Sequence, residues 1–339
     1  MPNQSTIEII AEIAQAHEGS LGIAHSYIDA LQDSGADTIK FQMHIAEAES
    51  SDQEQFRVKF SYEDNTRYDY WKRMEFDLEQ WAGLKKHCED KGFRFLCSPF
   101  SIKAVDWMEK LNVDRYKIAS GEVSNSLMLD KICRTGKSIL MSSGMSGFEE
   151  ILSSIDFISK HNGNFEGIFQ CTTSYPTPPE KYGLNVLSEL KKLNLGKVGL
   201  SDHSGEIYSS LAAVTMGAEM LELHVVFDKS MFGPDAKSSL TISEFKQLAD
   251  GVRKIERALK NPVDKNDTDQ YGVLKTMFGK SLALNKELKA GHILTFEDLE
   301  TKKPAELGIS AKDYKTVIGK KLKSDMSKNS FLNFSDLNG

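Results

Sequence analysis

Two lysines, Lys40 and Lys117, lie inside short apolar runs, where charged side chains are unusual. An ammonium group is costly to bury without a partner, so a buried lysine usually has an anion beside it. Ser98, Ser142 and Ser201 lie at the ends of other apolar runs and would add hydroxyl donors. The combination predicts a binding site for a phosphate or a carboxylate.

A structural alternative is that each lysine reaches solvent or pairs with a glutamate of the protein itself. Glu12, Glu122 and Glu222 stand in positions that would allow such pairing. One lysine of this kind would favour that alternative, whereas two lysines with three serines favour anion binding.

His203 and His224 end consecutive apolar runs. Neighbouring strands are about 5 Å apart, so two imidazoles at their ends can share a divalent metal ion. Two nitrogen ligands without thiolates leave positions open for water and substrate, as in a Lewis-acid centre. The alternative is a pair of hydrogen-bonded core histidines.

Other candidates follow the apolar runs. Glu18 could act as a general base, or it could be an ordinary acid at a helix start. Asp235 could accept a hydrogen bond from a sugar hydroxyl, or it could be a turn residue. Phe100, Tyr175 and Phe232 could pack on a sugar, or they could be ordinary rim residues.

These residues need a scaffold that brings them together, and the sequence pattern indicates one. Short β-rich runs, several of them almost continuously apolar, alternate with amphipathic helical runs. Continuous apolar strands are typical of parallel sheets covered on both faces. The expected strands are residues 7–13, 38–42, 93–97, 115–119, 138–142, 167–171, 197–201 and 220–226.

The expected helices are residues 22–34, 78–91, 102–111, 126–134, 148–161, 186–193, 207–216 and 242–258. Eight such units within roughly 260 residues are the number and length of an α/β fold of the (β/α)8 TIM barrel type. A doubly wound open sheet is the alternative, but it usually has a glycine-rich phosphate turn after its first strand. Residues 15–19 read Gln-Ala-His-Glu-Gly and contain no such turn. Barrel enzymes build active sites at the C-terminal ends of their strands, where the polar candidates lie.

Two further regions depart from the repeating pattern. Residues 44–77 form an unusually long connection, rich in acidic and aromatic residues, for which we expect a lid or a rim over the barrel mouth. The barrel domain should span residues 1–262, followed by a linker at 263–280 and a small domain of short strands at 281–339. That domain has a small core and should dock on something.

Composition excludes several protein classes. Hydrophobic residues make up 40% and charged residues 27% of the chain, which excludes a mainly disordered protein or a fibre. No apolar run approaches the roughly 18 residues of a membrane span, and residues 1–6 show no signal peptide. The four cysteines have no metal-binding spacing and predict reduced thiols in a cytoplasmic protein.

The net charge of −7 is unevenly distributed. Residues 275–339 contain 12 lysines and 8 acidic residues, so the preceding part of the chain is strongly acidic. An acidic body argues against nucleic acid as a partner. The basic segment could bind an anion or dock on the acidic body, or it could be a solvated surface.

In combination and order, these motifs resemble those of the sialic acid synthases, and the resemblance covers essentially the whole chain. The matching segments include Lys40-Phe41-Gln42, Ser98-Pro99-Phe100, Ser142-Ser143-Gly144-Met145, Gly199-Leu200-Ser201-Asp202-His203, Glu222-Leu223-His224 and Gly233-Pro234-Asp235, together with residues 11–19, 116–122 and 171–177. Residues 302–320 resemble the C-terminal antifreeze-like (SAF, β-clip) domain of that family.

The resemblance implies an activity and a set of site residues. The family condenses phosphoenolpyruvate with an N-acetylated hexosamine. The phosphoenolpyruvate site would be formed by Lys40, Ser98, Lys117, Ser120, Ser142, Thr173 and Ser201. The sugar site would be formed by Gln42, Phe100, Glu122, Tyr175 and Asp235. Glu18 would assist catalysis, and His203 and His224 would hold a divalent metal, usually Mn²⁺, with Mg²⁺ or Co²⁺ as alternatives.

The implied chemistry joins C3 of phosphoenolpyruvate to the open-chain aldehyde of the sugar, which the metal polarises. Water adds at C2 and phosphate leaves by C–O cleavage, while Lys40 and Lys117 stabilise its charge. The family also implies a domain-swapped homodimer, in which the small domain of one subunit caps the active site of the other.

The chain departs from the family at two positions. Lys303 stands where family members place an arginine that reaches the N-acyl group of the sugar, and lysine lacks the planar fork of arginine. Thr173 stands where some members have asparagine. The acceptor could be N-acetylmannosamine or a 2,4-diacetamido-trideoxy hexose, and the neuraminate, legionaminate and pseudaminate branches remain open.

Two other functions compete with this interpretation. A keto-acid lyase or aldolase would form a Schiff base at Lys117 and would leave the histidine pair unused. A catalytically silent sugar-binding protein would bind sugar without turnover. The complete set of polar residues at the strand ends argues against both.

Overall fold

The computed structural model describes residues 7–56 and 60–338. The chain divides into two compact units, Met1–Asn261 and Pro262–Gly339, which we describe separately. The predicted absence of a signal peptide concerns residues 1–6, which lie outside the described residues. Within those residues, no helix combines the length and the apolar character needed to cross a membrane.

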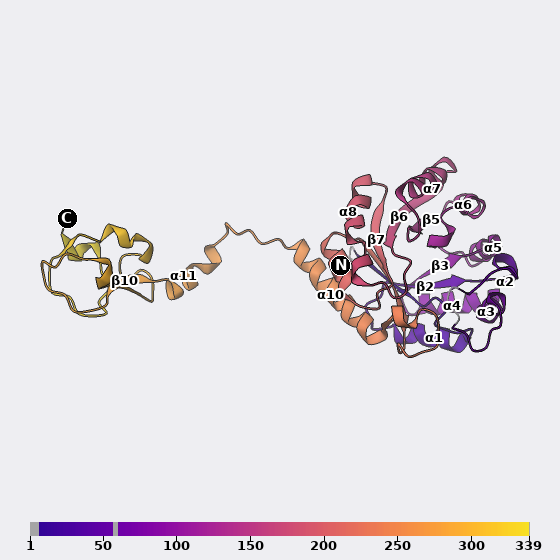
Figure 1. Ribbon diagram of the computed structural model, residues 1–339, viewed down its shortest axis with the longest axis horizontal. Coiled ribbons are helices and arrows are strands. Elements are labelled where there is room, and N and C mark those ends of the chain that lie inside the picture. Colours follow the sequence, from indigo (N-terminus) through magenta and orange to yellow (C-terminus); the bar gives the residue numbers. More distant parts are fainter. Residues whose placement is uncertain (1–6, 57–59, 339) are drawn as a thin grey trace. The chain divides into compact units, whose positions relative to one another are not determined.

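The first unit is a closed barrel of eight parallel strands (Figure 1). Each strand pairs with the next along the chain, and β1 also pairs with β8, which closes the barrel. This confirms the predicted barrel over the open sheet. The strands are β1 Glu8–Glu12, β2 Thr38–Met43, β3 Arg94–Pro99, β4 Arg115–Ile118, β5 Ser138–Ser142, β6 Asn164–Cys171, β7 Lys197–Asp202 and β8 Met220–Val226; the short β9, Leu240–Thr241, pairs with β8.

Helices surround these strands (Figure 1). They are α1 Leu21–Ala30, α2 Ala46–Glu49, α3 Arg67–Met74, α4 Leu78–Asp90, α5 Ile102–Lys110, α6 Ser126–Cys133, α7 Phe148–Lys160, α8 Leu184–Leu193, α9 Tyr208–Thr215 and α10 Ile242–Lys260. Eight of them match the predicted helices. The predicted end of the first helix at residue 34 is wrong, because the chain leaves the helix at Ala30 and turns through Gly35, which has a φ of +84°.

Side chains inside the barrel lie in layers because alternate residues of each strand point inward. An apolar cluster of Ile10, Leu96, Leu140, Phe169 and Met220 fills the middle of the barrel. Two residues further along β1, β3, β5 and β8, toward their C-terminal ends, the corresponding residues are polar: Glu12, Ser98, Ser142 and Glu222. The middle of the barrel is therefore a packed apolar core, and a polar layer covers this core at the C-terminal ends of the strands.

Residues 44–56 and 60–77, taken together, do not form one long extended loop. They contain α2 and α3 and have a small core of their own. This core comprises the buried residues Ala46, Tyr70, Trp71 and Met74, with Phe56, Phe60 and Tyr68 packed against them. Thr66 caps α3 through reciprocal bonds with Asp69, which fixes the start of that helix.

The second unit contains α11, Gly272–Phe278, and two short antiparallel pairs. These are β10 Ser281–Leu284 with β11 Leu299–Lys302, and β12 Lys321–Leu322 with β13 Leu337–Asn338. Its core is a small cluster around Leu282, Leu294 and Leu332. The predicted small domain of short strands is confirmed, whereas α11 was not predicted within the linker.

Candidate active site

The C-terminal ends of the strands bring two lysines and two glutamates together at the floor of the barrel mouth. Residue pairing places Glu12 of β1 opposite Lys40 of β2, and these two side chains form an ion pair. Glu222 Oε1 lies 3.4 Å from Lys40 Nζ and 3.3 Å from Lys117 Nζ. Lys117 Nζ also donates to Ser142 Oγ at 2.5 Å.

The structure combines the two alternatives for the lysines, namely pairing with glutamates of the protein and a position at a binding site. They pair with Glu12 and Glu222, as the structural alternative proposed, yet both also line a cavity. Burial lowers the pKa of Lys40 to about 8, although Glu222 opposes this shift. Burial alone would raise the pKa of Glu222, but Lys117 and Lys40 lower it. Within the described residues, Glu12 Oε1 and Glu222 Oε2 are buried without a hydrogen-bond partner, so the cluster retains unused acceptors.

His203 and His224 stand at the ends of neighbouring strands, with ring centroids 5.2 Å apart, and both line the cavity. His203 Nδ1 lies 3.1 Å from the carbonyl oxygen of Thr172, which suits a protonated Nδ1 and leaves Nε2 as the ligand atom. Burial and the neighbouring His203 ring hold the pKa of His224 well below its usual range, so its imidazole is neutral.

The histidine pair fits a divalent metal whose other positions are filled by water or substrate. Across the described ranges, no three His, Cys, Asp or Glu side chains converge as a complete set of protein ligands. A closed structural site is therefore not formed there, and two nitrogen donors beside a polar cavity suit an open Lewis-acid site. The metal itself stays a prediction.

A cavity of about 530 Å³ opens above this floor. It is large enough for two small substrates, and both charged and aromatic side chains line it. Most of the residues named from the sequence meet here: Lys40, Gln42, Phe100, Lys117, Ser120, Glu122, Ser142, Thr173, Tyr175, Ser201, His203, His224 and Asp235.

Four of the named residues do not line this cavity. Ser98 is 1% exposed, and its hydroxyl finds no hydrogen-bond partner within the described residues. Lys303 belongs to the second unit, where its Nζ lies 5.0 Å from the centroid of the Phe278 ring. Glu18 and Phe232 lie in a separate small recess that also touches His224 and Asp235.

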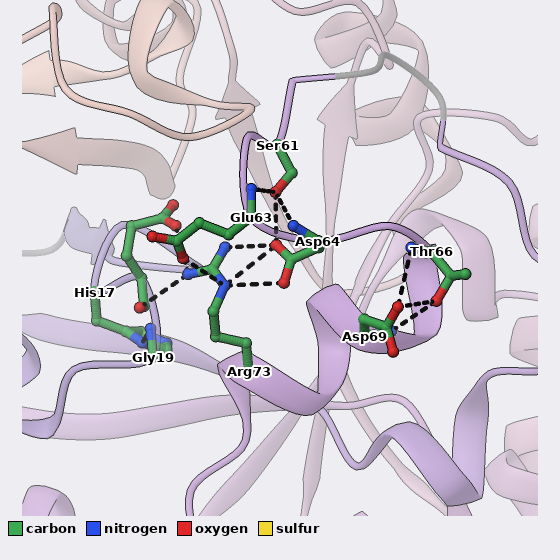
Figure 2. Close-up of polar contacts among 9 residues, drawn as sticks. His17, Gly19, Ser61, Glu63, Asp64, Thr66, Asp69 and Arg73 are labelled. Atoms are coloured by element: carbon green, nitrogen blue, oxygen red, sulfur yellow. Dashed lines mark hydrogen bonds and ion pairs between the residues drawn. The ribbon is translucent and has the colours of Figure 1, made fainter.

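Arg73 of α3 holds Glu18 in place. Figure 2 shows the same guanidinium bound to Asp64. Its Nη1 donates to both the carbonyl and the carboxylate of Glu18, each at 3.1 Å, while its Nε and Nη2 bind Asp64. Glu18 has a φ of +50°, a strained conformation for a residue with a side chain. Burial raises the pKa of Glu18 to about 7, although Arg73 opposes this shift.

The segment before α4 contributes a wall that the sequence did not reveal. A stack of π systems runs along this wall: the Arg67 guanidinium lies 4.1 Å from the centroid of the Trp71 ring. Trp71 stacks on His44 with centroids 3.8 Å apart, and His44 stacks on Phe100 at 4.3 Å. All four residues line the cavity.

Carboxylates on the same wall complete it. Glu54 accepts a hydrogen bond from Trp71 Nε1 at 3.1 Å and pairs with Arg67 Nε at 3.4 Å. Glu49 binds His44 Nδ1 at 2.7 Å. Burial and the charge of Glu49 raise the pKa of Glu122. The two carboxylates are therefore close enough to influence each other within the cavity. The only signal for this wall in the sequence was the richness of residues 44–77 in acidic and aromatic types.

The comparisons with known proteins agree with this geometry. The model of the NeuB family matches residues 27–264, and the SAF domain model matches residues 279–338. The chain belongs to the NeuB family. This confirms the family and the class of enzyme inferred from the sequence, a carbon–carbon bond-forming transferase of the sialic acid synthase type.

Relatives of this NeuB-family enzyme match along nearly its whole length. An N,N'-diacetyllegionaminic acid synthase of Campylobacter jejuni is 35% identical over 92% of this chain and 94% of its own. The human N-acetylneuraminate-9-phosphate synthase is 32% identical over 93% of this chain and 88% of its own. A crystal structure of the N-acetylneuraminic acid synthetase of Leptospira borgpetersenii, in complex with citrate, superposes with a TM-score of 0.69 and 26% identity, covering 79% of this chain and 90% of that one.

Proposed function

We propose that this NeuB-family enzyme condenses phosphoenolpyruvate with an N-acetylated hexosamine, and that it releases phosphate and a nine-carbon 2-keto-3-deoxy acid. The observation that carries the proposal is the single cavity whose floor holds the buried lysines and the histidine pair. The relatives named as legionaminic acid and neuraminate-phosphate synthases support the same reaction class.

Residues in different parts of the cavity would bind the two substrates. Lys40 and Lys117 would bind the phosphate and carboxylate of phosphoenolpyruvate, helped by the hydroxyls of Ser142 and Ser201. Binding of this anion would draw the lysines partly away from Glu222, whose carboxylate also accepts a hydrogen bond from Ser201 Oγ at 3.2 Å. Fixing phosphoenolpyruvate on the floor would orient its C3 toward an acceptor above.

The acceptor would occupy the upper cavity. Gln42, Glu122 and Asp235 offer hydrogen-bonding groups there, and Phe100 and Tyr175 offer aromatic faces. A Mn²⁺ ion held by His203 and His224 would polarise the aldehyde of the acceptor. Glu18, with its pKa raised to about 7, would exchange a proton near neutral pH.

Phosphate release tests this proposal directly. Metal-stripped protein would be incubated with phosphoenolpyruvate, Mn²⁺, and either N-acetylmannosamine or one of the 2,4-diacetamido-2,4,6-trideoxy hexoses. We expect release with one acceptor, loss of that release with a chelator, and loss with His203→Ala. Release without any metal would contradict the metal assignment.

The same preparation separates the competing functions. A Schiff-base lyase would be trapped at Lys117 by borohydride in the presence of a keto acid and would be indifferent to chelators. A silent sugar-binding protein would bind an acceptor in a calorimeter without any phosphate release.

We further propose that the enzyme works as a domain-swapped homodimer in the cytoplasm. The small core of the second unit and the exposed apolar side chains of α11, including Val273, Met277 and Phe278, support an assembly that covers them. The four cysteines, all free and buried, support a reducing compartment. Light scattering on the full chain would contradict the dimer if it gave a monomer's mass of 37.9 kDa.

A further inference from the structure

The cavity wall that holds His44 and Trp71 also contains a carboxylate whose second oxygen is unused. The side chain of Glu49 is only 7% exposed, and Glu49 lines the cavity. One oxygen, Oε1, binds His44 Nδ1 at 2.7 Å. The other, Oε2, is buried with no hydrogen-bond partner anywhere in the described parts of the chain.

The contacts of His44 fix the orientation of this carboxylate. His44 is stacked between Trp71 and Phe100, so its ring cannot rotate freely. We assign the amide of Gln15 as donor to His44 Nε2 at 2.7 Å, which leaves Nδ1 to donate to Glu49. Glu49 therefore presents a preoriented acceptor, held by a rigid aromatic stack.

A buried carboxylate oxygen without a donor is unfavourable unless a ligand supplies one. An ionised carboxylate only accepts hydrogen bonds, so the matching group must be an N–H or an O–H. Phosphoenolpyruvate carries negative charge and belongs with the lysines at the floor, which leaves the acceptor sugar as the molecule with donors to offer.

We propose that Glu49 contacts the acceptor sugar and that its Oε2 accepts a hydrogen bond from one N–H or O–H of that sugar. The proposal rests on the proposed condensation and adds a specificity-determining residue to it. The residue discriminates by the placement of a donor: a sugar without a donor at the matching position leaves the carboxylate unsatisfied and binds poorly.

The test uses Glu49→Gln in the full-length, Mn²⁺-loaded enzyme. Glutamine can still accept the bond from His44 through its carbonyl, while its NH₂ group replaces the free acceptor by a donor. We expect kcat/KM for the acceptor to fall by about 10- to 100-fold, as for loss of a hydrogen bond to a charged group. The KM for phosphoenolpyruvate should not change.

Glu47→Gln is the matched control. Glu47 lies two residues earlier in α2, is exposed, and pairs with Lys103 outside the cavity. Its variant should behave like the wild type. If Glu49→Gln does not fold, Glu49→Asp should show the same selective loss for the acceptor, because the shorter side chain withdraws the carboxylate.

Deoxy analogues of the acceptor identify its donor. The Glu49→Gln effect should disappear for the analogue that lacks the partner group and persist for the others. An unchanged kcat/KM for the acceptor, an equal loss for every analogue, or a parallel rise in KM for phosphoenolpyruvate would each overturn the proposal. If the wild type itself releases no phosphate, the proposed function fails, and calorimetric binding of the same sugars to wild type and Glu49→Gln then decides on Glu49.

Discussion

At the scale of single residues, the charged cluster at the barrel floor affects both the stability of the fold and the proposed binding of substrate. Lys40 and Lys117 are almost completely buried, and two glutamates pair with them. Removing one member of a buried ion pair is strongly unfavourable because the remaining charge loses its compensation. The lysines would move from the glutamates to an anionic substrate because the negative charge of the substrate replaces that of the glutamates beside them.

We therefore expect Lys117→Met to destabilise the protein by about 3 kcal/mol, near the lower end for a broken buried pair. The lower end applies because Lys40 still lies 3.4 Å from Glu222. Urea unfolding measures this difference. Adding Glu222→Gln to that variant should recover part of the stability without restoring phosphate release. No recovery in the double variant would show that the ion pair is not the cause.

Glu18 should make stability depend on pH. Burial raises its pKa in the folded protein from 4.5 to about 7, so the folded state binds a proton more readily than the unfolded state. Its contribution is fully present below about pH 4.5 and is lost as the pH rises through about 7. The wild type should therefore lose stability relative to Glu18→Gln between these values, measured as the difference between their unfolding temperatures. A constant difference across this range would contradict the raised pKa.

At the scale of elements, the side chain of Arg73 links α3 to the segment that follows β1. The Arg73 guanidinium bridges Glu18, in the segment after β1, and Asp64, before α3. Its contact with Asp64 is visible in Figure 2. Gly19 lies directly against the backbone carbonyl of Arg73, where any side chain would collide with it. This close approach explains why a glycine is needed there, beyond its φ of +75°.

We expect Arg73→Gln to loosen residues 61–74 while the barrel strands stay protected. The reason is that Asp64 and Glu18 lose a shared cation, whereas the strand hydrogen bonds are unaffected. Hydrogen exchange followed by mass spectrometry resolves the two regions. Lys72→Gln is the control, because Lys72 is exposed and pairs only locally with Glu75. If Arg73→Gln changed the exchange rates of residues 61–74 and of the barrel strands by the same factor, this attachment would be contradicted.

At the scale of the whole molecule, each unit has a core of its own. The barrel core extends across all eight strands and their helices, whereas the second unit depends on a small cluster. Small domains bury a smaller fraction of their surface and are less stable. The two units should therefore differ in thermal stability when each is studied as a separate fragment.

A chain ending at residue 261 should fold into the barrel and unfold cooperatively, because its core contains no residue of the second unit. The isolated segment 262–339 should unfold at a lower temperature. Calorimetry of both fragments and of the full chain tests this. If the truncated barrel cannot fold, its stability depends on contacts with the second unit.

The barrel, the small domain and the floor of the site could be predicted from the sequence. The alternation of strands and helices is a local pattern, and the C-terminal ends of parallel strands necessarily meet at one end of a barrel. Lys40, Lys117, His203 and His224 could therefore be placed together from their positions in the strands alone. The resemblance to a family then supplied the roles of the remaining residues.

Which side chains contact one another, in contrast, depends on how the chain folds. The pairing of Lys117 with Glu222 across two nonadjacent strands, and that of Arg73 with Glu18, depend on how the closed barrel and α3 bring distant residues into contact. The wall containing Glu49 has no periodic pattern that could reveal it, because its helices α2 and α3 have only 4 and 8 residues and pack around a few aromatic side chains. Its position over the cavity follows from packing, which spacing in the sequence does not encode.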